Sequence, residues 1–380
     1  MEYSTKQLNL TLKIDYMSTT KKISKFIENA LNNAQKSNQL PTLSINKIIV
    51  EKPRNKSFGN WSTNIAMTLS KELKKNPLDI AKTITNNIEK NDVIENIEII
   101  KPGFINFKLS ENFRSNLLKQ ILNEKKSFGS NVEGKGKQIQ LEFVSVNPTG
   151  PVHVGHARGA IVGSCIANIL GFSGYTVTKE YYVNDAGKQI DMYLESIKSK
   201  IFKNFGENFP FPENGYQGEN VIEISNKIIS KLNIDKDNLE KIDNKKIKDA
   251  SIKFTLEQIK QDLSGLGIEY DNWFFESSLF ENKTIEKVRQ TLNEKNLIFK
   301  KDGAEWFKSS AFYTENDVVL KRSKNEGHTY FFSDIAYHYD KFLIRNYDEV
   351  INIFGADHHS HVDRLKSAVK ALDIDTKKLK

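Results

Sequence analysis

The sequence has almost no cysteine and no long hydrophobic run. Its single cysteine, Cys165, excludes internal disulfides and any zinc site built from cysteines. No apolar run approaches the roughly 20 residues that span a bilayer. The N-terminus lacks the apolar core and the small-residue cleavage site of a secretory signal. We therefore expect a cytoplasmic protein with no membrane partner.

The 380 residues are 38% hydrophobic and 27% charged, the composition of an ordinary globular protein. A chain of this length can bury a large core and is expected to form two or three domains. The formal net charge of +8 would suit an anionic partner such as nucleic acid. Lysine and asparagine are both abundant, however, and a compositional bias of the source genome would give the same surplus. The charge alone leaves both explanations open.

The first part of the chain has the pattern of a small α+β domain. Residues 1–16 are polar and show no pattern, and Met17 is an alternative start, so we assign this N-terminal domain to 17–130. Ser62 or Thr63 is expected to cap its second helix. The spacing of apolar residues predicts helices at 21–35, 62–75, 77–89 and 111–126, a strand at 44–53, and a pair of strands around Pro102-Gly103.

Beyond a polar linker at 133–137, the pattern changes to strand, tight turn and helix. The strand at 138–146 is followed by a helix and then by a strand at 176–185, which makes one βαβ unit of a parallel sheet. The strand-turn-helix pattern recurs at 328–342 and 348–372, and short strands are expected at 304–309 and 317–323. We therefore predict an α/β, Rossmann-like domain over 138–380, with an insertion at about 198–250.

The turn between the first strand and helix, NPTGPVHVGH (147–156), carries the strongest chemical signal. Its prolines and Gly150 restrict the backbone, and Gly155 removes the side chain where a flat base could lie. His153 and His156 are expected at the helix N-terminus, where free N–H groups and the helix dipole favour anions. Two imidazoles there can donate to phosphate oxygens and stabilise charge in a transition state. Capping or surface roles for the two histidines are the alternative.

This turn resembles the first signature of class I aminoacyl-tRNA synthetases, and specifically of arginyl-tRNA synthetase. The resemblance covers nearly the whole chain after Met17. It implies a Rossmann-like catalytic domain preceded by a small α+β domain that contacts tRNA. The matching segments are LEFVSVNPTGPVHVGHARGAIVG (141–163), KEYYVNDAGKQI (179–190), DGAEWFKSS (302–310), TYFFSDIAYHYDKF (329–342) and FGADHHSHVDRLKSAVKAL (354–372), preceded by FGNWSTNIAMTLSKELKKNP (58–77) and KPGFINFKL (101–109).

The resemblance implies an arginine–tRNA ligase whose partners are ATP, L-arginine and tRNA(Arg). The arginine carboxylate attacks the α-phosphate of ATP, and the 2′-hydroxyl of the tRNA terminal adenosine then takes the arginyl group. Mg²⁺ would accompany ATP as the substrate complex, with no tightly bound cofactor and no side-chain nucleophile. The resemblance makes His153 and His156 catalytic and ATP-binding, with Gly155, and places Asp357 and His358 near the ATP ribose and base.

Arginine specificity calls for carboxylates, because the guanidinium is planar, always charged and offers paired donors. By resemblance, Glu142, Tyr330 and Asp334 line the side-chain pocket, and Asn147 holds the backbone end of the amino acid. Glu142 is expected on the strand before the turn, and Asp334 after a strand formed by 329–333. A surface carboxylate and a helix N-cap are the respective alternatives for Glu142 and Asp334.

Two further groups of residues receive less specific roles. Asn184 and Asp185, at the end of the next strand, are assigned to positioning in the active site. Phe58, Trp61 and Asn64 in the front domain are candidates for contacting an exposed tRNA base, since stacking with an amide hydrogen bond is a usual way to read unpaired RNA. Ordinary core packing explains Phe58 and Trp61 equally well.

The histidines near residue 360 do not predict a metal site. His358, His359 and His361 cluster with Asp357, but neighbouring residues on a helix diverge and do not easily share one coordination sphere. In the resembled family a small residue and then an aromatic usually follow this histidine pair. Ser360 and His361 stand there in this sequence.

Two other functions remain open. A nucleotidyltransferase for a small substrate uses the same His-x-Gly-His turn, but such enzymes are much shorter and would need neither the front domain nor the Glu142 and Asp334 pair. A non-catalytic tRNA-binding relative would keep the fold. Loss of the signature histidines would favour that relative, but His153 and His156 are both present.

The sequence contains no Lys-Met-Ser-Lys-like stretch, and the phosphate-clamping loop and anticodon-binding domain of the resembled family are absent from it. We therefore expect a monomeric fragment with little or no aminoacylation activity alone. Pyrophosphate exchange with arginine and tRNA is the measurement, and near-normal rates from the isolated 380-residue chain would contradict this expectation.

Overall fold

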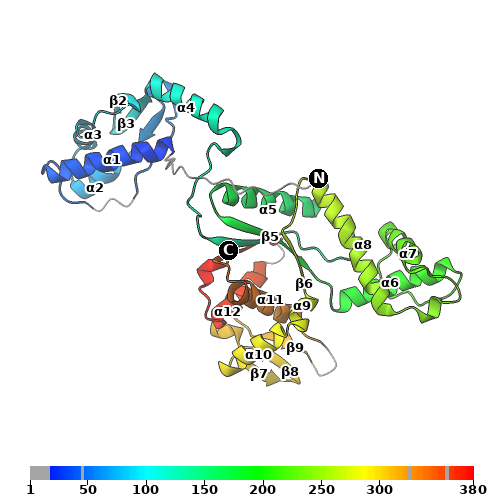
Figure 1. Cartoon of the computed structure of the whole chain (residues 1–380). Coiled ribbons are helices and arrows are strands. Elements are labelled where there is room, and N and C mark those ends of the chain that lie inside the picture. Colours follow the sequence, from blue (N-terminus) through cyan, green and yellow to red (C-terminus); the bar gives the residue numbers. More distant parts are fainter. Residues whose placement is uncertain (1–17, 44–46, 323–326, 356–358) are drawn as a thin grey trace. The chain divides into compact units, whose positions relative to one another are not determined.

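The computed structural model describes residues 18–43, 47–322, 327–355 and 359–380 (Figure 1). The chain divides between Asn131 and Val132 into two compact units, each with its own apolar core. Within the described ranges, no helix combines the length and the apolar character needed to cross a membrane.

The N-terminal unit packs helices against a three-stranded antiparallel sheet of order β1-β3-β2. Ile23, Ile27 and Leu31 recur every four residues and are fully buried, which explains why this segment is an amphipathic helix. Phe107 of the central strand is fully buried in the same core. The elements are α1 (Thr19–Lys36), η1 (Lys56–Phe58), β1 (Trp61–Thr63), α2 (Ile65–Leu73), α3 (Pro77–Asn86), β2 (Ile94–Ile100), β3 (Phe104–Leu109), α4 (Glu111–Glu124) and η2 (Lys125–Ser127).

The structure differs from two expectations for this unit. Of the strand expected at 44–53, the first three residues lie outside the described residues, and the rest pairs with the sheet only through one isolated bridge between Glu51 and Ser62. Ser62 and Thr63 belong to β1, and α2 begins after them. Thr63 still acts as a partial cap, because its hydroxyl accepts the Ile65 N–H at 3.3 Å.

The second unit is built on a four-stranded parallel sheet of order β10-β4-β5-β6, which confirms the predicted fold class. From β4 the chain adds β5 and β6 on one side and returns to add β10 on the other. The strand order therefore reverses between β4 and β10, the place where open parallel sheets bind ligands. The elements that form the sheet and its connections are β4 (Gln138–Glu142), α5 (Val154–Phe172), β5 (Thr176–Val183), β6 (Asn272–Phe275), α9 (Ser277–Glu281), α10 (Thr284–Glu294), α11 (Tyr330–Tyr339), η5 (Asp340–Ile344), β10 (Glu349–Asn352), α12 (His359–Ala371) and η7 (Thr376–Lys378).

Successive residues of β5 serve different cores because side chains alternate across a sheet. Tyr181 and Val183 pack with residues of α5 and of the long helix α8 (Asn244–Gly265). Tyr182 packs on the other cluster, with Phe274 and with Tyr337 of α11. The parallel sheet thus has apolar cores on both faces.

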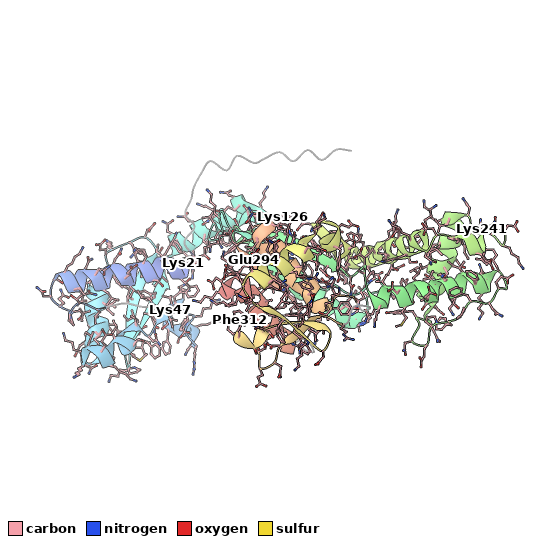
Figure 2. The ribbon with its side chains drawn as sticks, turned by 90° about the horizontal axis from the view of Figure 1, so that it is seen from below. Lys21, Lys47, Lys126, Lys241, Glu294 and Phe312 are labelled. Atoms are coloured by element: carbon pink, nitrogen blue, oxygen red, sulfur yellow. The ribbon has the colours of Figure 1, made fainter. Side chains whose placement is uncertain are left out.

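A helical part projects from the parallel sheet in both views (Figures 1 and 2). It consists of α6 (Lys188–Asn204), α7 (Glu219–Leu232), η3 (Leu239–Lys241) and most of α8. Figure 2 places Lys241 at its far end. The segment 198–250, expected to be an insertion, lies here and shares a small apolar core.

A three-stranded antiparallel sheet, β7 (Ile298–Lys301), β8 (Ala304–Phe307) and β9 (Val318–Lys321), lies in the same unit, with η4 (Ser309–Ala311) between its last two strands. The expected strands at 304–309 and 317–323 correspond to β8 and β9.

The segment 329–333 is not the strand that the sequence analysis expected. Tyr330 begins helix α11, and the two buried phenylalanines that follow recur four residues later as Ile335 and Ala336. This spacing puts the four side chains on one buried face of a helix. Asp334 therefore lies within the helix rather than at its N-cap.

The contact between α5 and Phe143, the residue after β4, gives a stability prediction. Gly163 is buried, and a Cβ there would lie 2.2 Å from Phe143 Cγ, whereas Gly159 of the same helix has open space. We expect Gly163→Ala to lower the free energy of unfolding by about 1–3 kcal/mol. Gly159→Ala should raise it by up to about 1 kcal/mol through helix propensity. Urea unfolding of both variants is the measurement, and equal shifts in the two would contradict the close contact.

A candidate site at the carboxyl ends of the parallel strands

The connection from β4 to α5 leaves the sheet through a strained segment held by two tyrosines. Val144 has φ 71°, in the left-handed region that β-branched residues rarely adopt. On one side of it, Tyr270 Oη donates to the Phe143 carbonyl at 3.0 Å. On the other side, Tyr181 Oη donates to the Val146 carbonyl at 2.8 Å. These contacts fix the backbone that leads into the histidine turn.

His153 and His156 form a capping box at the start of α5. His153 Nδ1 accepts the Gly155 N–H at 3.1 Å, and His156 Nδ1 accepts the His153 N–H at 3.3 Å. Because Nδ1 accepts in both rings, each neutral imidazole carries its proton on Nε2. Both histidines therefore take part in capping α5. Their Nε2–H groups remain as two donors at a helix N-terminus, a place that favours anions.

The two imidazoles are also stacked, with ring centroids 3.6 Å apart. Burial, and then the neighbouring His153, lowers the pKa of His156 below its ordinary value. The ring is therefore mostly neutral at pH 7, and it can donate through Nε2–H without carrying a charge.

A chain of side-chain amides connects this turn with the next strand end. Asn147 Nδ2 donates to Gln189 Oε1 at 2.6 Å, and Asn147 Oδ1 lies 3.1 Å from the amide of Asn184. The other end of the Asn184 amide is 2.8 Å from Glu276 Oε2. The residues that follow β4, β5 and β6 thus meet at one edge of the sheet, as parallel strands require.

Glu276 is a site residue that the sequence analysis missed. It directly follows β6, a strand that the sequence analysis did not predict, and only 4% of it is exposed. Burial, and the nearby carboxylates of Asp334 and Asp185, raise its pKa to about 7, although a hydrogen bond with Ser333 opposes the shift. Asp185 is held in turn, because its Oδ1 accepts the Ser277 N–H at 2.9 Å.

Two tyrosines show which acidic groups gather here. Burial and the charges of Glu276, Asp334 and Glu142 together raise the pKa of the Tyr182 phenol well above its ordinary value. Tyr330 is half exposed at the start of α11. Burial and the charge of Glu276 raise the pKa of Tyr330, and a hydrogen bond with Asn184 opposes this shift. The structure therefore brings Glu142, Asp334 and Tyr330 to one site together with Glu276.

Glu142 and Asp334 each have a partner from the protein. Lys341 Nζ donates to Glu142 Oε2 at 2.7 Å, and both side chains are buried. His361 Nε2 lies 2.9 Å from Asp334 Oδ2. A cationic ligand would share these carboxylates with Lys341 and His361, neither of which the sequence analysis assigned to the site.

Two of the expected site residues, Asp357 and His358, lie outside the described residues. Among the residues that are described, no group of three or more histidine, cysteine or acidic side chains could hold a metal ion.

The three tRNA-contact candidates lie in the N-terminal unit and are not all together. Phe58 is 41% exposed and lines a cavity of about 280 Å³. Trp61 packs against the apolar core, and Asn64 precedes α2 without capping it through its side chain; neither lines this cavity. The other lining residues are Lys56, Ser57, Gly59, Asn60, Asn96, Glu98, Asn106, Lys108 and Arg114.

The raised pKa of Glu276 makes stability depend on pH. Because the pKa of about 7 in the folded chain exceeds the ordinary 4.5, the folded state holds an extra proton between these values. Stability therefore falls as the pH rises from about 4.5 to about 7. Glu276→Gln should remove up to about 3 kcal/mol of this loss. Urea unfolding at pH 5 to 8 tests this, with Glu281→Gln, an exposed carboxylate on α9, as the control. Parallel curves for wild type and Glu276→Gln would contradict it.

Two family models match the chain. Residues 21–109 match the arginyl tRNA synthetase N-terminal domain, and residues 117–380 match the catalytic domain of class I (R) tRNA synthetases. Arginine–tRNA ligases from Acetivibrio thermocellus and Caldanaerobacter subterraneus subsp. tengcongensis are 41% and 43% identical over 94% and 92% of this chain. The chain spans 64% and 62% of their lengths, less than two thirds of each.

A solved structure shares the fold. Arginyl-tRNA synthetase from Plasmodium falciparum superposes with a TM-score of 0.67 at 24% identity, over 95% of this chain and 64% of its own. The family models together cover most of the sequence, in the order of the two units found in the structure. The chain therefore belongs to the arginyl-tRNA synthetase family of class I aminoacyl-tRNA synthetases.

Proposed function

We propose that this chain carries the amino-acid activation site of an arginine–tRNA ligase, and that the whole protein transfers arginine to the 2′-hydroxyl of the tRNA terminal adenosine. The main support is that contacts through Asn147 and Asn184 connect the turn of the two histidines with the acidic side chains at the same edge of the parallel sheet. The first group suits the phosphates of ATP, and the second suits a guanidinium.

On the nucleotide side, the turn offers two imidazole N–H groups as hydrogen-bond donors. The Nε2–H groups of His153 and His156 can donate to phosphate oxygens, and these bonds strengthen as negative charge builds up at the α-phosphate. Mg²⁺ would come with ATP as part of the substrate. Asp357 and His358 remain candidates for the ribose and base.

On the amino-acid side, the proposed site gathers acidic side chains that are buried or partly buried. Asp334 and Glu142 offer carboxylates to the planar guanidinium, with Tyr330 at the edge of the site. Asn147, joined to Asn184, suits the backbone end of arginine because amides can bind both its ammonium and its carboxylate. Bound arginine would bring the positive charge that favours ionisation of Glu276, whose pKa is raised without it.

The N-terminal unit supports a tRNA partner. Phe58 lines a cavity whose wall also carries the amide side chains of Asn60 and Asn106 and the cations Lys108 and Arg114. An exposed aromatic ring beside amides and cations can stack on an unpaired base, read its edge and contact phosphate. Of the initial candidates, only Phe58 fits this proposal.

The non-catalytic alternative is not favoured by the geometry. Both signature histidines are present, and both keep an Nε2–H donor after capping α5. A chain that only bound tRNA would need neither this turn nor the acidic site around Tyr182.

The arginine pocket is tested by the preference for L-arginine over L-lysine in calorimetric binding to the chain with ATP present. Asp334→Asn and Glu142→Gln should each reduce this preference at least about tenfold, because each replaces a charged acceptor that matches the guanidinium. Glu142→Gln also leaves the buried Lys341 unpaired, at a cost of about 3–5 kcal/mol in stability, so Asp334→Asn is the clearer variant.

The control is Glu195→Gln, which removes a half-exposed carboxylate on α6 and should leave the preference unchanged. An unchanged arginine preference in both pocket variants would refute the assignment of Glu142 and Asp334.

A further inference from the structure

Lys341 is a fully buried cation between the sheet and the helix that carries Asp334. It lies in the π-helical turn η5, immediately after α11. Its ammonium donates to Glu142 Oε2 at 2.7 Å and to Asn352 Oδ1 at 2.9 Å, and it lies 3.9 Å from the ring centroid of Tyr337. Lys341 thus joins the ends of β4 and β10 to the end of α11.

A second set of hydrogen bonds leads from Lys341 to the backbone of Asp334. The carbonyl of Asp334 can only accept, so His338 Nδ1, 2.7 Å away, is the donor. His338 Nε2 must then accept from Asn352 Nδ2 at 2.8 Å, which leaves Asn352 Oδ1 facing Lys341. Burial, and then the charge of Lys341, lowers the pKa of His338 well below its ordinary value, so the ring stays neutral and the direction of these bonds is fixed.

The ion pair between Arg345 and Glu180 nearby uses both oxygens of its carboxylate. Arg345 contacts both oxygens of Glu180, at 2.5 and 3.0 Å, and Asn272 and Tyr337 also donate to that carboxylate. Glu180 is therefore engaged from several sides inside the protein. Lys341 instead contacts Glu142 through Oε2, at the strand end that faces the candidate site.

We propose that Lys341, Asn352 and His338 form a positioning unit that holds Glu142 and Asp334 at a fixed separation, so that the two carboxylates fit one guanidinium. Lys341 binds Oε2 of Glu142, so that Oε1 of the same carboxylate would bind the ligand. Asn352 and His338 connect the Lys341 ammonium by hydrogen bonds to the backbone carbonyl of Asp334. This inference rests on the proposed arginine pocket.

Stability alone does not account for such an arrangement. Replacing a buried ion pair by well-packed apolar side chains is often neutral or stabilising, because both charges must be desolvated. The same buried lysine becomes useful where a carboxylate must keep its charge and its orientation at the edge of a binding site.

The experiment measures calorimetric binding of L-arginine and L-homoarginine, with ATP present, to the full chain and its variants. Both ligands carry a guanidinium, but the longer one places it about one methylene further along. A fixed pair of carboxylates should therefore prefer arginine. We expect Lys341→Met and Asn352→Leu each to reduce the ratio of arginine to homoarginine affinity at least about fivefold, while ATP affinity stays within about twofold.

If Lys341→Met does not fold, Asn352→Leu tests the positioning role, because this variant keeps the ion pair between Lys341 and Glu142. The matched control is Gln140→Met. Gln140 lies on the same strand as Glu142, and its fully buried amide donates to Glu180 rather than to Glu142. It should leave the affinity ratio within about twofold of wild type.

The outcomes separate this inference from the function on which it rests. Wild type that binds neither ligand would overturn the proposed arginine site itself. Wild type that prefers arginine, with variants that keep the ratio or weaken both ligands equally, would overturn the positioning role of Lys341 and leave the pocket standing.

Discussion

The polar groups that follow β4, β5 and β6 share one site because these parallel strands end at the same edge of one sheet. Glu142, Asn184 and Glu276 come from distant parts of the chain, and each follows or ends a strand of this sheet. The reversal of strand order between β4 and β10 opens the position that α5 begins to fill with its histidine turn. The register of the sheet sets the positions of these polar side chains, because each lies at or directly after the end of a strand.

The main cost of the arrangement is the burial of charge. Lys341 and Glu142 are buried together, and Glu276 is buried next to two further carboxylates. Isolated charges would not tolerate such surroundings, so each is paired, hydrogen-bonded or shifted in pKa. A cationic ligand would relieve the repulsion among the acidic groups around Tyr182, which supports the proposed preference of this site for positive charge.

Much of the fold was predictable because the hydrophobic periodicity was strong. The strands at β4, β5 and β10, the helix after the histidine turn and the α+β character of the front domain follow from it. The segment 329–333 was predicted as a strand because its aromatic residues favour strands. It forms the start of α11 because its buried positions repeat at helical spacing. Glu276 was missed because β6 is short and its residues are only partly buried, so no pattern marked the strand end that carries it. Lys341 looked like any other lysine in a lysine-rich chain, since only tertiary packing reveals its burial.

The histidine turn shows how one residue can serve both structure and chemistry. A histidine at a helix N-cap uses Nδ1 to satisfy a backbone N–H that would otherwise lack a partner. That bond fixes the tautomer, and the tautomer places a proton on Nε2. In His153 and His156 the same geometry that starts α5 therefore prepares two donors for an anion. The stacked rings therefore present two Nε2–H donors side by side, and hydrogen bonds from them would strengthen as negative charge develops on a bound anion. Capping and the proposed phosphate binding are thus compatible roles for these residues, because the first creates the conditions for the second.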